Sequence, residues 1–292
     1  MIIINLITTA INLIIITGIT IITMAIIYNN VGGFGKNDEK KPVFNVIGVG
    51  PGDTELITVK AIKAIKNSDF IFYPEVSYLN TSLSIDIIKD YIDIQKDRLI
   101  PLEIEMKKSF ERNMDLYREN ALKIIAKLKE GGVCSYITVG DPSFYSTYAG
   151  LYTALKNEPD FEATGAKINI IPGISSLNYA FGLLKDSYIT KKSSVLISVP
   201  VNKDSFEINS EIEFLYKKKE RPQVIVFMKA GNYVKNILEV FRKLYYNEFK
   251  EGKLKLYLIE KSEIIEDFCK TDIYTGKKES FDYFSILISI FL

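Results

Sequence analysis

Short runs of apolar, mostly β-branched residues alternate along this chain with longer amphipathic stretches, and loops rich in Gly and Pro separate them. The apolar run Phe44–Gly48 is followed by such a loop, by a helical pattern over Thr58–Asn67 and by a second apolar run, Phe70–Tyr73. This alternation favours βαβ units, in which parallel strands form a sheet covered by helices. Because parallel strands end at the same edge of their sheet, the loops that follow them are expected to lie together.

The pattern continues to the last residues of the sequence. We expect further helices at Ser82–Tyr91, Ser109–Glu130 and Tyr145–Leu155, and further strands at Val133–Val139, Ile168–Ile171, Ser194–Val199, Val224–Met228, Lys255–Ile259 and Phe284–Phe291. The stretch Asn157–Ala166 contains Pro, Gly and acidic residues, which are typical of a linker. The prediction is an α/β protein with two α/β domains, residues 41–160 and 161–292, and a cofactor cleft between them.

An apolar segment and a charged hinge, together residues 1–40, precede the predicted domains. Residues 1–35 contain no charged side chain, and the apolar run over residues 1–28 exceeds the roughly 20 residues that cross a bilayer. As a membrane anchor, with Lys36–Lys41 on the cytoplasmic side, it would leave the catalytic domain in the cytoplasm. The alternative is that translation begins later, at Met24 or beyond.

Composition excludes several kinds of chemistry. The sequence has no histidine, so His-dependent zinc sites and Ser-His-Asp triads are excluded, and we expect no metal. Its 37 Lys and Arg residues nearly balance 36 Asp and Glu residues, a net charge of +1 that indicates no nucleic-acid partner. Cys134 and Cys269 lie too far apart for a CxxC motif, and each is expected to be a buried, reduced thiol.

Two loops follow predicted strands in the first half. The sequence "GVGPGD", Gly48–Asp53, lacks the spacing of a dinucleotide-binding loop, and it is either a ligand loop or only a tight turn. In "VGDPSFYSTY", Val139–Tyr148, Asp141 is either an acceptor for a ligand or a helix cap. Its rings, among them Phe144, either support a planar or cationic ligand or belong to the core.

Two more loops follow strands of the second half. "IIPGISS" ends in Ser175 and Ser176 at the start of a predicted helix, and "VFMKAG" offers the soft side chain of Met228 and the charge of Lys229. Four such loops at strand ends are the expected layout of a ligand cleft between two α/β domains.

Taken together in this order, the four loops resemble the tetrapyrrole methylase family of S-adenosylmethionine-dependent methyltransferases. The resemblance covers about Asn45 to Leu292 and rests on "VGVGPGDTELITVKAIKAIKNSDFIFYP", "GDPSFYSTY", "IPGISS" and the terminal "YFSILI". Within the family, the "FYST" sequence after Gly-Asp-Pro is similar to the precorrin-2 (or cobalt-factor II) C20-methyltransferases of cobalamin biosynthesis. The uroporphyrinogen methylases usually have Tyr-Asp-Arg where this chain has Tyr73-Pro74-Glu75.

The resemblance implies roles for individual residues. Contacts with S-adenosylmethionine are implied for Pro51, Val139, Gly140, Asp141, Phe144, Ser175, Ser176 and Met228, and contacts with the tetrapyrrole substrate are expected for Gly50, Gly52, Asp53, Lys107 and Arg112. Lys108, Lys191, Lys192 and Lys229 are further candidates for the substrate carboxylates, although any of these cations could equally be a solvated surface charge. Asp141 and Tyr145 are the candidate catalytic residues, as proton acceptors.

The family resemblance also implies a homodimer. Two other functions are compatible with the sequence. One is methylation of a tetrapyrrole at a different ring carbon. The other is a membrane-tethered, non-catalytic binding module that keeps the same fold, since a fold alone does not fix a function.

Overall fold

The computed structural model describes residues 41–76, 82–92, 98–105, 110–201, 203–218, 221–261, 263–267 and 280–292, with backbone only for 110–112 and 265–267. Residues 41–292 form a single unit by their internal contacts. The apolar run over residues 1–28 therefore lies outside the described part of the chain. No helix within that described part is both long enough and apolar enough to cross a membrane.

The first sheet is fully parallel and has the strand order β3-β2-β4-β1-β5. Its strands are β1 (Val43–Gly48), β2 (Phe70–Val76), β3 (Leu99–Ile104), β4 (Val133–Thr138) and β5 (Lys167–Ile171). In the centre, β1 pairs with β4 so that Gly48 lies opposite Thr138, and with β5 so that Ile47 lies opposite Ile171. The loops that follow these three strands therefore leave the sheet at the same edge.

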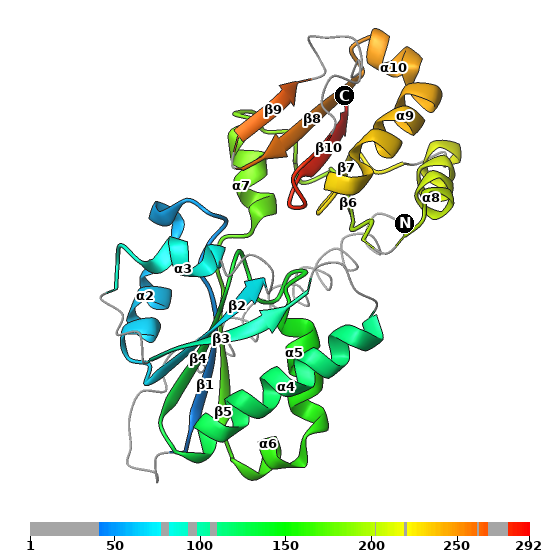
Figure 1. The fold of residues 1–292 in the computed structure, drawn as a ribbon. Coiled ribbons are helices and arrows are strands. Elements are labelled where there is room, and N and C mark those ends of the chain that lie inside the picture. Colours follow the sequence, from blue (N-terminus) through cyan, green and yellow to red (C-terminus); the bar gives the residue numbers. More distant parts are fainter. Residues whose placement is uncertain are drawn as a thin grey trace, which may run out of the picture. The chain divides into compact units, whose positions relative to one another are not determined.

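Helices cover both faces of this sheet (Figure 1). They are α2 (Val59–Lys66) and α3 (Leu83–Ile88) on one face, and α4 (Phe110–Lys129), α5 (Tyr148–Asn157) and α6 (Pro159–Ala163) on the other. Side chains alternate along a strand, so Phe44 and Val46 pack under α4 and α5 whereas Ile47 packs under α2 and α3. Both faces of β1 carry buried apolar side chains, as expected for a parallel sheet that is buried on both sides, and its buried polar residue Asn45 donates to Ser135 Oγ at 3.3 Å.

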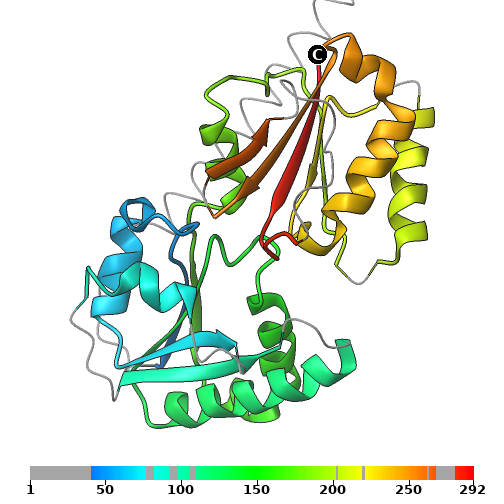
Figure 2. The same ribbon diagram turned by 45° about the horizontal axis from the view of Figure 1, so that its top comes forward.

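The second sheet is mixed and has the strand order β6-β7-β10-β8-β9. Its strands are β6 (Val195–Ser198), β7 (Val224–Phe227), β8 (Leu254–Glu260), β9 (Glu263–Asp267) and β10 (Ile286–Phe291). The helix α7 (Ser176–Leu183) packs on one face, and α8 (Ser205–Lys217) and α9 (Val234–Leu244) pack on the other (Figure 2), with α10 (Tyr246–Lys250) following α9. The terminal strand β10 lies between β7 and β8, so it is integral to the sheet.

Local capping interactions begin α2, which the sequence predicts from Thr58, and α8, which was not predicted. Thr58 accepts a hydrogen bond from the backbone N–H of Ala61 at 3.1 Å at the start of α2. Asp204 and Glu207 form a reciprocal capping box at the start of α8. Each of these bonds satisfies a backbone N–H that has no partner inside the helix.

Most of the predicted strands and helices are confirmed, but the expected linker is wrong. Residues 159–163 of that stretch form α6, and β5, which we expected to open the second half, pairs with β1 in the first sheet. The first sheet therefore contains all of the first five strands, and the chain enters the second sheet only at β6. The short strand β9 and the helices α8, α9 and α10 have no counterpart among the predictions. Cys134 is a buried free thiol, as predicted, whereas Cys269 lies outside the described residues.

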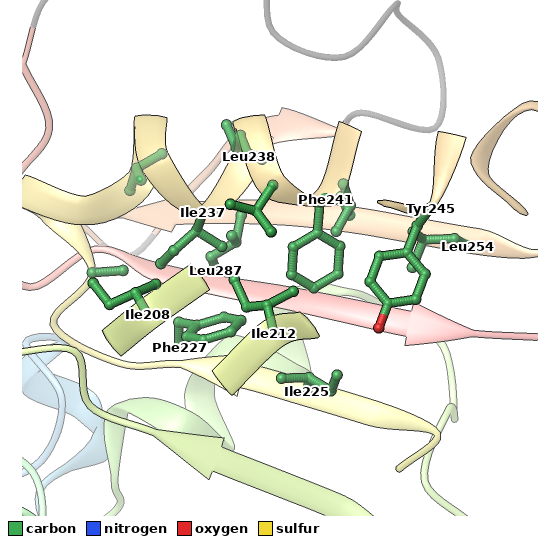
Figure 3. Packing of buried hydrophobic residues seen from close by; sticks show 14 of the residues in the cluster. Ile208, Ile212, Ile225, Phe227, Ile237, Leu238, Phe241, Tyr245, Leu254 and Leu287 are labelled. Atoms are coloured by element: carbon green, nitrogen blue, oxygen red, sulfur yellow. The ribbon is translucent and has the colours of Figure 1, made fainter. Parts of the chain in front are cut away.

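The core between the second sheet and α8 and α9 is made of aliphatic and aromatic side chains (Figure 3). Phe241 meets Phe227 edge to face, with ring centroids 6.2 Å apart. Ile237 lies in the same cluster and is fully buried. We expect Ile237→Val to lower the free energy of unfolding by about 0.5–1.5 kcal/mol, because it removes one buried methyl group. Urea denaturation of the full chain measures this loss, and Ile189→Val, at an exposed position, is expected to change the stability little.

Candidate functional site

The loops after β1 and β4 are joined directly to each other. The backbone N–H of Gly140 donates to the carbonyl of Gly50 at 2.7 Å, and that of Val49 donates to the carbonyl of Thr138 at 3.0 Å. Gly50 and Gly140 form an isolated antiparallel bridge although their strands are parallel. This bridge holds two of the predicted ligand loops at one edge of the first sheet.

The loop after β5 reaches the same place through a close backbone approach. A Cβ added at Gly48 would lie 2.6 Å from the backbone nitrogen of Gly173, and it would lie closer still to the carbonyl oxygen of Gly140. A Cβ added at Gly173 would lie 2.7 Å from the carbonyl carbon of Gly48. Real Cβ atoms do not come so near backbone atoms, so the three loops can meet only because both residues are glycine.

Asp141 ties the loop after β4 to the loop after β5. One carboxylate oxygen accepts from the backbone N–H of Ser143 at 2.7 Å, and the other accepts from that of Gly173 at 3.0 Å. The interpretation of Asp141 as a helix cap is wrong, because α5 begins only at Tyr148 and Thr147 occupies the capping position. The side chain instead links two loops that are separated by 32 residues.

The helix predicted to begin at Tyr145 begins three residues later, because Tyr145 has a left-handed backbone, with φ of 50°. Its side chain is 45% exposed, and its ring meets that of Phe144 edge to face at 4.8 Å between centroids. Phe144 packs against the apolar cluster that contains Val226 and Met228 of the second sheet. The Tyr145 carbonyl accepts from the Lys229 ammonium at 2.9 Å.

Hydroxyl groups of β4 hold the end of the loop that follows this strand. The Tyr136 hydroxyl and Thr147 Oγ1 lie 2.6 Å apart, and Thr138 Oγ1 lies 3.3 Å from Ser146 Oγ. Burial raises the pKa of Tyr136, so its hydroxyl stays protonated over the physiological pH range and can form a hydrogen bond with Thr147. These contacts fix the Ser146-Thr147 part of the "FYST" sequence on β4.

The predicted residues Ser175 and Ser176 lie beside Gly140. Ser175 caps α7, and its Oγ accepts from the backbone N–H of Asn178 at 3.3 Å. A Cβ added at Gly140 would lie 3.9 Å from Ser175 Cα and from the Ser176 nitrogen. The start of α7 is therefore in van der Waals range of the loop after β4.

Other predicted residues have different surroundings. Asp53 accepts from the backbone N–H of Glu55 at 3.0 Å and so caps a short 3-10 helix, η1 (Thr54–Leu56), while Pro51 and Gly52 are half-buried in the same loop. Met228 is buried in the apolar cluster of the second sheet. Lys107 and Lys108 lie outside the described residues, as does the Arg112 side chain, and Lys191 and Lys192 are exposed.

Two features of the site were not predicted from the sequence. One is the close packing of Gly173, which the Pro172-Gly173 turn hints at but does not specify. The other is the contact between Lys229 and Tyr145, which joins residues 84 positions apart.

Comparison with known sequences gives consistent matches. The sequence profile of the tetrapyrrole (corrin/porphyrin) methylases matches residues 43–251. The "probable cobalt-precorrin-2 C(20)-methyltransferase" of Methanocaldococcus jannaschii is 36% identical over 192 residues, which cover 66% of this chain and 74% of that protein. The precorrin-2 C(20)-methyltransferase of a Sinorhizobium species is 27% identical over 143 residues, which cover 47% of this chain and 56% of that protein.

Solved structures share the fold. A cobalt precorrin-4 methyltransferase superposes with a TM-score of 0.58 at 17% identity, over 88% of this chain and 98% of that one. The uroporphyrin-III C-methyltransferase of Thermus thermophilus, complexed with S-adenosylhomocysteine, superposes with a TM-score of 0.52 at 13% identity, over 85% of this chain and 96% of that one. At identities this low, the structural similarity shows only that the chains share the α/β fold with two sheets.

Proposed function

The chain belongs to the tetrapyrrole (corrin/porphyrin) methylase family, and from this membership we propose that it methylates C20 of precorrin-2 or of cobalt-factor II. The methyl donor is S-adenosylmethionine, which the methylases of this family use. The relatives that support C20 as the target are the two precorrin-2-type enzymes, of which the first is 36% identical to this chain.

The meeting of the loops after β1, β4 and β5 is the observation that carries the proposal. It brings Gly140, Asp141, Ser175 and Ser176 to one edge of the first sheet through the bonds to Gly50 and Gly173. These are residues for which the family resemblance implies contact with the methyl donor. In α/β proteins, ligands bind at this carboxyl edge of the strands.

The residues at this edge fit a donor with a polar amino-acid end, a positively charged sulfonium and a flat, neutral ring. Gly140 has no side chain where it faces the start of α7, so the backbone there can approach a ligand closely. Ser176 offers a hydroxyl, and the rings of Phe144 and Tyr145 offer aromatic faces and edges. When bound, S-adenosylmethionine supplies an activated methyl group on a sulfonium, so the protein needs no metal or covalent nucleophile.

The remaining tasks of the protein are orientation and removal of a proton. Holding donor and acceptor in line can contribute about 7–11 kcal/mol to lowering a barrier, and the linked loops are suited to that task. For the proton that C20 loses, we propose Asp141 or Tyr145 as the acceptor. We also propose that basic side chains, including Lys107 and Arg112, bind the carboxylates of the tetrapyrrole, and that the enzyme is a homodimer.

A turnover assay of the full chain tests the function. The chain is incubated with S-adenosylmethionine carrying an isotope-labelled methyl group and with either metal-free precorrin-2 or cobalt-factor II. We expect one labelled methyl group in the product by mass spectrometry, and NMR is expected to place it on C20. A label on another carbon would favour a different methylase of the family, whereas donor binding without any turnover would favour a non-catalytic binding module.

A further inference from the structure

Lys229 lies between two residues whose backbones are held firmly. The N–H of Met228 donates to the carbonyl of Ser198 at 2.9 Å, and that of Ala230 donates to the carbonyl of Ser285 at 2.8 Å. Between these bonds Lys229 has a φ of 54°, a left-handed conformation that is unfavourable for a residue with a Cβ. Because Lys185 is left-handed as well, the backbone conformation alone does not distinguish Lys229, and the contact made by its side chain does.

The ammonium group of Lys229 is directed at a second strained residue. Its Nζ donates to the carbonyl oxygen of Tyr145 at 2.9 Å, and Tyr145 itself has a φ of 50°. Lys229 is half-buried, and this burial lowers its pKa, so the ammonium has lost part of its water. The hydrogen bond that it donates to the Tyr145 carbonyl compensates for that loss.

The bonded carbonyl lies in a part of the loop on which several site residues depend. Immediately before it, the backbone of Phe144 closes a turn on the carbonyl of Asp141 at 3.3 Å, and the Phe144 ring packs on the second sheet. Immediately after it, Ser146 meets Thr138 on β4. A shift of the Tyr145 peptide would therefore move both the Phe144 ring and the residues that follow.

We propose that Lys229 is a positioning residue, whose ammonium holds the Tyr145 carbonyl and thereby fixes Phe144 and Tyr145 against the methyl donor. This role differs from the contact with a substrate carboxylate considered from the sequence. Its catalytic consequence rests on the proposed function, whereas the hydrogen bond and its effect on the loop do not.

The test compares Lys229→Met with Lys185→Met in the full chain. Methionine keeps much of the length of lysine but cannot donate, and Lys185 is an exposed lysine that is also left-handed, with φ of 55°. We expect Lys229→Met to speed amide hydrogen exchange in residues 143–147 and to weaken the binding of S-adenosylhomocysteine about tenfold. The KM for the methyl donor should rise more than kcat falls, and Lys185→Met should change none of these quantities.

Unchanged exchange in residues 143–147, together with unchanged affinity for S-adenosylhomocysteine, would overturn the proposal. If Lys229→Met does not fold, Lys229→Gln, a shorter side chain that can still donate, is expected to show the same changes to a smaller degree. If the wild-type chain neither binds S-adenosylhomocysteine nor transfers methyl groups while Lys229→Met still speeds exchange, the proposed function fails and the contact stands.

Discussion

Replacing Gly48 with alanine is expected to lower kcat/KM for methyl transfer by at least about 100-fold, since a displacement of 1 Å at a reacting centre can cost that much. The added Cβ would lie 2.6 Å from the Gly173 nitrogen and would collide with the Gly140 carbonyl oxygen. These are backbone atoms that cannot rotate away as a side chain would, so the loops must separate. We also expect a loss of about 1–3 kcal/mol in the free energy of unfolding, as in other overpacked interiors.

Gly182→Ala is the matched control for that substitution. Gly182 lies in α7, and a Cβ added there meets no atom within 4 Å. Alanine suits a helix better than glycine, so this variant should keep wild-type activity and gain about 0.5–1 kcal/mol in stability. Steady-state kinetics and urea denaturation of both variants give the comparison, and wild-type activity in Gly48→Ala would show that the loops can function apart.

Asp141→Asn is expected to reduce methyl transfer by about 100-fold and the free energy of unfolding by about 1.5–3 kcal/mol, the range for hydrogen bonds to charged groups. The carboxylate accepts from two backbone N–H groups, those of Ser143 and Gly173. An asparagine side chain has one oxygen and one NH₂ group, so it would turn a donor toward one of those N–H groups. The loops after β4 and β5 would then lose their link, and hydrogen exchange at the Gly173 amide should become faster.

Asp53→Asn serves as the control for the change of a carboxylate to an amide. Asp53 accepts from the N–H of Glu55 at the start of η1, and asparagine caps a helix about as well as aspartate. We therefore expect little change in stability from this variant. If Asp141→Asn left the Gly173 amide protected and the activity unchanged, Asp141 would neither tie the loops nor accept the proton from C20.

The sequence predicted several elements where their signals are local. Thr58 marks the start of the predicted helix α2 through a bond that spans three residues. The apolar run before Gly48 and the run after Gly132 were predicted as strands, and they are β1 and β4. Such patterns depend on near neighbours in the chain, which a single sequence displays.

Predictions were wrong where distant residues decide the structure. Tyr145 was expected in a helix, but its carbonyl is bonded to Lys229 and its backbone is left-handed. The strand β5 was assigned to the second half, but it pairs with β1 across more than 120 residues. In both cases the partner lies far along the chain, so no local pattern identifies it.

By itself the sequence determined the family, most of the strands and the four loops that could carry a ligand, because these depend on residue types and on spacing along the chain. The tertiary structure alone decided how the loops meet. Gly48 and Gly173 approach so closely that neither tolerates a Cβ, and Asp141 binds two backbone N–H groups from different segments. Such contacts join positions that are adjacent only after the sheet has formed.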